Sequence, residues 1–312
     1  MRGLVLGLLF ASLPAGAADE LNGFSVDGAS VPAGAILAGG PARDGIRSVD
    51  EPRFVGVEAA TWAADDTQVI GLEIDGDARA YPVHLLEYHQ VVNDEFSGQP
   101  VVVTYDPIAG TPIAFDARVD GEPLQFGVSG LLYESNFLLY DRGSESLWSQ
   151  LLGLAVSGPK QGTRLRRIRS RQEAFVVWRH RHPETRVLER PLPRRIDYRY
   201  SRFHEYWISD TVPFPVSVRD DRFHPKAGVL GVVAGDKARA YLGPVLTAAG
   251  GRIVDEFEGH RIRIAYDVAA SSFSWEIPDE IEVTDAYWFA WKTFHRDTEV
   301  WQPEADQLEE AE

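Results

Sequence analysis

The sequence predicts an α+β fold with mainly antiparallel sheet and an internal pseudo-repeat that gives two related halves. Residues 69–81 recur in related form at 229–241, and residues 94–98 recur at 255–259. Predicted strands outnumber helices and do not alternate regularly with them, which favours antiparallel sheet over a doubly wound fold. A repeat of this kind determines architecture, so it is considered before any local feature.

Each half is expected to open with a β-hairpin. The turns at 75–77 and 235–237 contain the glycine and aspartate that accept positive φ angles. In the first half, Pro82 suits the first position of a helix, and apolar residues recur at helical spacing through residues 83–92. Residues 93–98 would end this helix and turn the chain.

Further strands and a closing helix complete each half. The strands are predicted at residues 100–105, 113–115, 261–266 and 273–275. The closing helices are amphipathic and are predicted around residues 171–182, before Pro183, and around residues 285–295.

The two halves differ in length. Residues 178–182 recur at 291–295, a spacing of 113 residues instead of the 160 or 161 of the earlier matches, so the first half has about 47 residues that the second lacks. The predicted divisions are a signal peptide at 1–17, an N-terminal extension at 18–44, a first repeat at 45–190 with an inserted segment at 117–163, a linker at 191–227, a shortened second repeat at 228–302 and an acidic tail at 303–312. The inserted segment is predicted to form short strands at 124–128, 136–140 and 151–156.

The N-terminus predicts export. A short positive start is followed by an apolar stretch at residues 3–14 and a small-residue cleavage site at 15–17. The apolar stretch is too short to span a membrane, and no later transmembrane segment is predicted. We therefore expect a soluble protein that is periplasmic or secreted.

The composition limits the chemistry. The chain contains no cysteine, so disulfides, thiol redox chemistry and cysteine-ligated metals are excluded. The net charge is −16, and loss of the signal peptide with Arg2 makes it −17, which argues against nucleic acid as a partner. Residues 164–202 are the exception, with thirteen arginines and four acids. This arginine belt either docks an acidic protein partner, through Arg164, Arg166 and Arg167, or pairs with the protein's own acidic groups.

Several residues have the chemistry of a binding site. His89 lies on a predicted helix where the second repeat has Ala249 or Gly250. Asp106 follows a strand, although Asp267 repeats it, so a turn cap is the alternative. The remaining candidates lie in the inserted segment, where an arginine could clamp an anion, although a polar hairpin with a core tryptophan would look the same. They are Tyr140, Asp141, Arg142, Trp148 and Gln150.

Several strings resemble a known family. They lie at residues 71–82, 102–105, 126–133, 140–142, 146–150, 158–159, 182–183 and 214–216. Through them the chain resembles, over about residues 45–300, the bacterial and archaeal family catalogued as domain of unknown function 3179. The resemblance implies no transferable activity.

The chain departs from that family at one place. Members typically carry a Cys-Pro-Leu-Cys-Gly-Thr-like element after the strand that ends at Tyr105, whereas residues 106–111 here read Asp-Pro-Ile-Ala-Gly-Thr. Asp106 and Ala109 stand where the two cysteines would be. A thiolate pair is thus replaced by one carboxylate and one methyl group.

Three functions remain open. The first is a catalytically degenerate, non-redox module that binds a small-molecule or anionic ligand through the candidate residues. The second is a metal-dependent or acid–base enzyme that uses His89 and Asp106, with Asp141 as a third oxygen ligand. The third is an envelope docking or structural protein that uses the arginine belt. No cofactor is identified.

Overall fold

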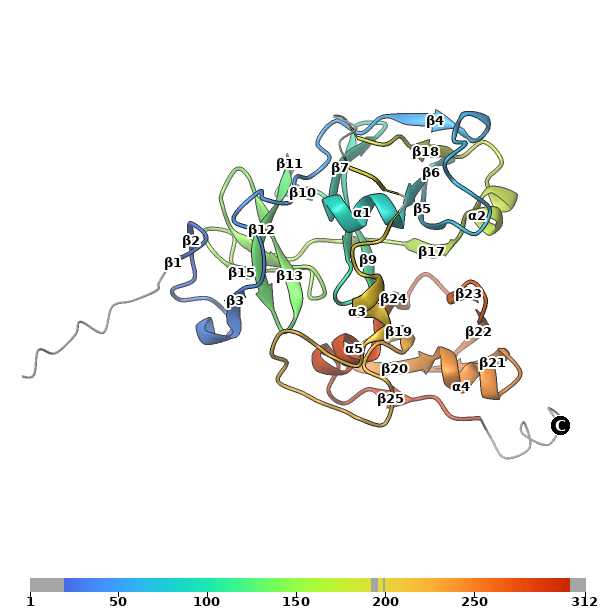
Figure 1. Cartoon of the computed structure of the whole chain (residues 1–312). Coiled ribbons are helices and arrows are strands. Elements are labelled where there is room, and N and C mark those ends of the chain that lie inside the picture. Colours follow the sequence, from blue (N-terminus) through green and yellow to red (C-terminus); the bar gives the residue numbers. More distant parts are fainter. Residues whose placement is uncertain (1–19, 192–195, 199, 304–312) are drawn as a thin grey trace, which may run out of the picture.

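The protein is mostly β. The computed structural model describes residues 20–191, 196–198 and 200–303, of which 43% lie in strands and 14% in helices. Five sheets are arranged like the blades of a five-bladed β-propeller (Figure 1). The predicted α+β fold with two related halves is therefore wrong. The α-helices of the protein have only five to seven residues each, which is too short to form a layer over the sheets.

Two of the sheets are formed largely by residues 45–190. The first has the order β17 (Ser170–Ala174), β5 (Gln68–Ile74), β6 (Asp77–Pro82), β18 (Arg186–Leu188) and β4 (Phe54–Gly56). The second has the order β16 (Arg167–Ile168), β9 (Thr111–Asp116), β8 (Gln99–Asp106) and β7 (Val91–Phe96).

The third sheet contains the inserted segment, and the fourth and fifth come from residues 228–302. The third is β15 (Leu154–Ser157), β14 (Leu147–Ser149), β13 (Asn136–Asp141), β12 (Phe126–Tyr133) and β3 (Ile36–Ala38). The fourth is β24 (Glu282–Tyr287), β19 (Gly228–Ala234), β20 (Lys237–Leu242) and β25 (Glu299–Val300). The fifth is β21 (Arg252–Phe257), β22 (His260–Asp267) and β23 (Ser272–Glu276).

The remaining elements are short. Two hairpins pair β1 (Glu20–Leu21) with β2 (Phe24–Ser25) and β10 (Arg118–Val119) with β11 (Glu122–Pro123). The α-helices are α1 (Val83–His89), α2 (Phe175–Arg181), α3 (His204–Ile208), α4 (Gly243–Ala248) and α5 (Trp288–Phe294). Two 3₁₀ helices are η1 (Ala33–Ala35) and η2 (Val57–Ala59).

The repeated strings occupy matching positions in two pairs of sheets. The order β17-β5-β6-β18 corresponds to β24-β19-β20-β25, and in both the last strand pairs in parallel while the other neighbours are antiparallel. The order β7-β8-β9 corresponds likewise to β21-β22-β23. The segment that occurs once supplies most of the third sheet, so the unit of this architecture is the sheet and not the half.

The helices are shorter than the sequence predicts. Gln90 has a φ of +59° and its amide donates to the carbonyl of Leu86, which ends α1 at His89. The β-branched Val91 and Val92, predicted as the end of the helix, instead start β7, which continues through most of the turn predicted at residues 93–98. The predicted helix at 171–182 similarly begins as a strand, β17, before α2.

The packing of a tryptophan ring against a strand glycine occurs in two of the sheets. Trp178 is buried over Gly71 and donates to Thr185, and Trp291 is buried over Gly231 and donates to Thr298. A Cβ atom at Gly71 would lie 2.2 Å from the Trp178 ring. Glycine here allows close packing of ring on backbone.

Replacing Gly71 by alanine is therefore expected to destabilise the protein by about 1–3 kcal/mol, because the added methyl group overpacks the core. Urea denaturation measures the change. Gly56→Ala is the matched control, since Gly56 also lies in a strand but has nothing within 4 Å of an added Cβ. Equal effects of the two substitutions would contradict this account of the packing.

The arginine belt is largely used inside the molecule. Arg167 donates to the Thr284 hydroxyl, Arg169 to the carbonyls of Ile277 and Pro278, and Arg171 to the carbonyl of Trp275. These contacts join residues 164–171 to residues 275–284. Toward solvent, Arg166 pairs with Asp116 and Arg164 donates to the Leu152 carbonyl.

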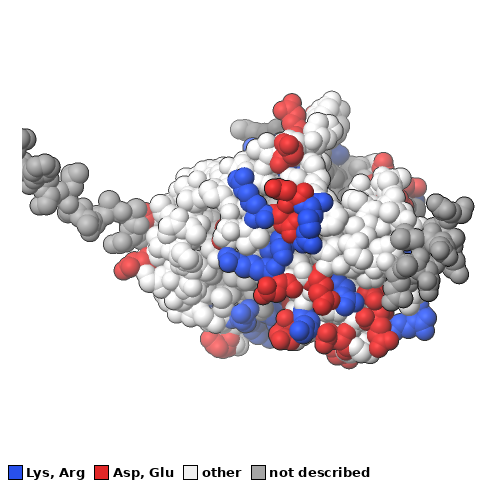
Figure 2. Space-filling view, turned by 90° about the horizontal axis from the view of Figure 1, so that it is seen from below, with Lys and Arg blue, Asp and Glu red and all other residues white. Residues whose placement is uncertain are grey.

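Acidic and basic side chains are interspersed on the face shown in Figure 2, where no large patch carries one sign of charge. Some predicted features lie outside the described residues: the signal peptide, residues 18–19, 192–195 and 199, and the acidic tail from residue 304. Within the described part, no helix has the length and apolar character needed to cross a membrane.

Candidate functional site

His89 is held by two hydrogen bonds. Its Nδ1 lies 2.7 Å from the carbonyl oxygen of Arg47, and its Nε2 lies 2.7 Å from the hydroxyl of Tyr198. Burial lowers the pKa of His89, which favours the neutral ring. With both nitrogens engaged, the ring has no free atom for a metal.

Asp106 is a buried structural carboxylate. Its Oδ1 accepts hydrogen bonds from the amides of Ile108 and Ala109, and its Oδ2 accepts from the side chain of Asn136 and the amide of Phe137. Burial raises the pKa of Asp106 to about 6, and these four donors oppose the rise. The side chain therefore caps its own loop and ties that loop to β13.

Three further candidates belong to the core. The Trp148 indole is fully buried and donates to Asp141, which also accepts from Ser144. Gln150 is buried and bonds to Thr111 through both its oxygen and its nitrogen. These contacts satisfy the polar atoms of the third sheet internally and leave no wall for a ligand.

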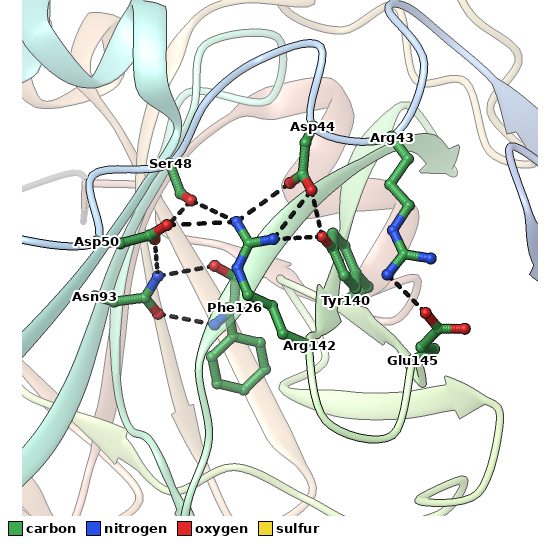
Figure 3. A network of polar contacts seen from close by, with 9 residues as sticks. All are labelled: Arg43, Asp44, Ser48, Asp50, Asn93, Phe126, Tyr140, Arg142 and Glu145. Carbon is green, nitrogen blue, oxygen red and sulfur yellow. Dashed lines mark hydrogen bonds and ion pairs between the residues drawn. The ribbon is translucent and has the colours of Figure 1, made fainter.

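Arg142 lies in a partly exposed polar network, which the buried Tyr140 joins through its hydroxyl (Figure 3). Arg142 donates to Asp44 and Ser48 and lies 3.5 Å from a carboxylate oxygen of Asp50, while the Tyr140 hydroxyl donates to Asp44 at 2.5 Å. Two carboxylates already occupy the guanidinium, which leaves it poorly suited to clamp a free anion.

The three weak metal candidates are not brought together. His89, Asp106 and Asp141 have separate partners, and no group of three or more metal-ligating side chains gathers anywhere in the described residues. The alternative of a metal-dependent enzyme built on these residues has no geometric support.

A different place has the features of a site. A cavity of about 690 Å³, which we name the central cleft, lies between α1, α3 and the ends of β5, β8, β17, β19, β22 and β24. Both α1 and α3 lie near the middle of the molecule in Figure 1. The polar lining includes Gln68, His84, Glu87, Gln172, Arg190, Ser201 and Lys226, and the aromatic lining is Trp62, Tyr105, Tyr198, Trp207, Tyr266 and Tyr287. Its volume is typical of small-molecule sites.

Unsatisfied polar atoms converge on the central cleft. Within the described residues, seven buried side-chain nitrogen or oxygen atoms have no hydrogen-bond partner, and six of them belong to residues that line this cavity. The six are Trp62 Nε1, Gln68 Oε1, Glu87 Oε2, Gln172 Oε1, Arg190 Nε and Trp207 Nε1. Buried polar groups are rarely left unpaired, because each costs about 1–3 kcal/mol. The six atoms have almost no accessible surface, so a partner in the cleft would reach them only after a small movement of these side chains.

Two residues that line the cleft, His84 and Glu87, have pKa values shifted from their usual range. Both lie on α1, three residues apart and so on one face. Burial raises the pKa of Glu87 to about 7, against opposing contacts from Ser201 and the Arg202 backbone. Burial, with a smaller effect of Arg190, lowers the pKa of His84 to about 4. At neutral pH the imidazole is therefore uncharged, and the carboxyl is present in both its protonated and its ionised form.

The amine of Lys226, which lines the cleft, is held by contacts within the protein. The amine donates to the carbonyl of Ser209 and lies 4.2 Å from the ring centre of Tyr206. Burial lowers the pKa of Lys226. Its positive end is therefore already engaged by the protein.

Sequence reasoning missed His84 and Glu87, although a signal was present. The corresponding positions of residues 228–302 are Pro244 and Thr247. The criterion that selected His89, a titratable group present in only one copy, selects these two residues as well.

The loop that departs from the family pattern lies behind the cleft. The Tyr206 hydroxyl donates to the carbonyl of Ile108, and the Tyr287 amide donates to the carbonyl of Ala109. Tyr287 itself lines the cavity. Residues 106–110 thus support one wall of the cleft, although Asp106 itself does not line the cavity.

Fold and site together define a mostly β protein in which four of the five sheets contribute residues to a polar and aromatic cleft. Residues 43–277 match the family model described as "Protein of unknown function (DUF3179)", and the chain belongs to this family. The resemblance inferred from the sequence is thereby confirmed. Neither the curated proteins nor the solved structures include a match to the chain.

Proposed function

We propose that this protein is an exported binding module for a small polar molecule, which it holds in the central cleft. The observation that supports the proposal is the convergence of six unpaired buried polar atoms on one cavity. Maintaining them without a partner is costly, and a bound ligand would recover that cost. The N-terminal pattern at residues 1–17 supports export.

The test is ligand-dependent stabilisation. The mature protein is screened by thermal denaturation against a broad panel of sugars, amino acids, organic acids, polyamines and nucleosides. A ligand that binds only the folded state at 100 times its Kd adds about 2.7 kcal/mol of stability. We expect the response to a hit to weaken in Trp207→Phe, which removes a cleft donor and keeps a ring, and to persist in Trp301→Phe outside the cleft. A hit equally strong in both variants would place the site elsewhere.

A second candidate is an acid–base enzyme acting in the same cleft. A buried carboxyl with a pKa near 7 beside a neutral imidazole suits proton transfer at physiological pH. In this version Glu87 replaces His89 and Asp106 as the acid–base group. Incubation of any hit with wild type and Glu87→Gln distinguishes the candidates, since an enzyme converts its ligand and the variant binds without conversion.

The docking alternative now depends on Arg164 and Arg166, because Arg167 is engaged inside the molecule. Arg167, Arg169 and Arg171 contact the protein's own backbone or hydroxyl groups. Arg164 and Arg166 remain at the surface, and a salt-sensitive pull-down with these two replaced would still test an acidic partner.

A further inference from the structure

We infer that a second site, separate from the central cleft, binds a small organic anion that carries a short apolar group. The site is a cavity of about 570 Å³, which we name the side groove. One wall comes from β17 and α2, and the other from the sheet β21-β22-β23. The two walls meet where β17 packs beside β23 (Figure 1).

The strand register of the β21-β22-β23 sheet explains why a cavity forms here. Arg252 of β21 lies opposite Ala265 of β22, which in turn lies opposite Ser274 of β23. Arg252 and Ser274 are exposed and Ala265 is half-buried, so this row of side chains is on the solvent-facing side of the sheet. Alanine and serine are small. The side chains that β17 and α2 add from the opposite wall therefore enclose a space above these two residues.

The lining of the side groove carries more positive than negative charge. Four arginines line it together with two glutamates, so the formal charge of the lining is +2 in a chain whose net charge is −16. Each glutamate is paired with one arginine, Glu173 with Arg181 and Glu276 with Arg263. The other two arginines, Arg171 and Arg252, form no ion pair within the described part of the chain. An anion is the partner that these two side chains lack.

Arg171 is held next to other positive charges. Its Cζ lies 3.6 Å from the centre of the Trp275 ring, and its guanidinium donates one hydrogen bond to the Trp275 carbonyl. Burial lowers the pKa of Arg171 to about 10, and repulsion from Arg181 and Arg169 outweighs the attraction of nearby carboxylates. An anion in the side groove would offset that repulsion, and the guanidinium has further N–H groups to donate to it.

Exposed apolar side chains lie in the same cavity as these charges. Val177 of α2 and Val254 of β21 both line the side groove and are 42% and 46% exposed. They are two of six large apolar side chains that are exposed within the described residues. Inorganic phosphate would leave both valines in water, whereas an apolar group on the ligand would cover them. The combination favours an organic anion over an inorganic one.

The test is calorimetric titration of the full mature chain at low ionic strength with two matched pairs of anions, hexanoate with acetate and hexyl phosphate with inorganic phosphate. In at least one pair we expect the six-carbon anion to bind at least tenfold more tightly, since burial of two methylene groups is enough for that gain. The pair with the tighter binding identifies the head group. Hexylamine, which has the same chain and the opposite charge, should not bind.

Two substitutions in the side groove separate charge from shape. Arg252→Gln should weaken binding of the anion about fivefold, because it removes an exposed charge that has no ion-pair partner among the described residues. Ala265→Leu should abolish binding, because the larger side chain fills the floor and leaves every charge in place. Arg261→Gln is the matched control for Arg252→Gln, since Arg261 is an exposed arginine of the same sheet that does not line the side groove.

Three results would overturn the inference: equal binding of hexylamine and the six-carbon anions, unchanged affinity in a folded Ala265→Leu variant, or no binding of either six-carbon anion to the wild type. The test is independent of the proposed function, because no described residue lines both the side groove and the central cleft. Trp207→Phe in the central cleft should therefore leave the affinity for the anion unchanged. An anion whose binding is lost in that variant would be a ligand of the central cleft.

Discussion

Replacing Glu87 by glutamine is expected to stabilise the protein increasingly as the pH rises. Burial raises the pKa of Glu87 from 4.5 to about 7, so the folded state favours the protonated carboxyl. That contribution to stability is fully present below about pH 4.5 and is lost as the pH rises through 7. Glutamine does not ionise, so the advantage of the variant over wild type should grow by up to about 3 kcal/mol between pH 4 and pH 8.

The measurement is the free energy of unfolding in urea at pH 4, 6, 7 and 8 for both proteins. Glu95→Gln serves as a control, because Glu95 lies exposed on β7 and its replacement should change stability little at any pH. A difference between wild type and Glu87→Gln that stays constant across this range would show that Glu87 is not held in an ionisation-disfavouring environment.

The direction of this effect bears on function. A residue that lowers stability at neutral pH has to be maintained for another reason, and functional sites are where such costs are usually found. If Glu87→Gln is more stable and binds its ligand less well, the carboxyl is used by the site. If it is more stable and binds equally well, Glu87 contributes nothing to the proposed binding.

Removing the Asp106 side chain should have the opposite and larger effect. Asp106→Ala leaves four buried donors without their acceptor, on Ile108, Ala109, Asn136 and Phe137. Each unpaired buried donor costs about 1–3 kcal/mol, partly relieved by rearrangement, so we expect a loss of about 3–5 kcal/mol. Denaturant unfolding monitored by tryptophan fluorescence measures it.

The chain contains a matched control for this substitution. Asp267 is the last residue of β22 as Asp106 is the last of β8, and it accepts from the amides of Ala269 and Ala270 in the same kind of turn. Asp267 is exposed, so Asp267→Ala should cost about 1 kcal/mol or less. Similar losses in the two variants would mean that the contacts of Asp106 with β13 contribute nothing.

These contacts also explain what stands at the family's cysteine position. The carboxylate of Asp106 accepts four hydrogen bonds in place of any thiol chemistry, and Ala109 is fully buried beside it. In this chain the loop supports Tyr287, which lines the cleft, and holds α3 through the hydroxyl of Tyr206. We therefore look for function in the cleft and not at residues 106 and 109.

The sequence by itself determined the family and the local features that depend on neighbouring residues. The strings around Gly71 and Trp148 identify the family, and the turns at 75–77 and 235–237 follow from glycine and aspartate. The Asx turn at Asp106 was among the alternatives, because its donors lie two and three residues away. Each of these depends on chemistry within a few positions of the chain.

Only the tertiary structure decided the arrangement of sheets and the site. Whether His89 is free depends on Arg47 and Tyr198, which lie 42 and 109 residues away. The raised pKa of Glu87 likewise results from burial by distant parts of the chain. The central cleft is lined by residues that range from Trp62 to Tyr287 along the sequence. A sequence pattern records periodicity along the chain but not which distant surfaces exclude water from a group. Burial and hydrogen-bond satisfaction, which separate a structural residue from a functional one, are set by that packing.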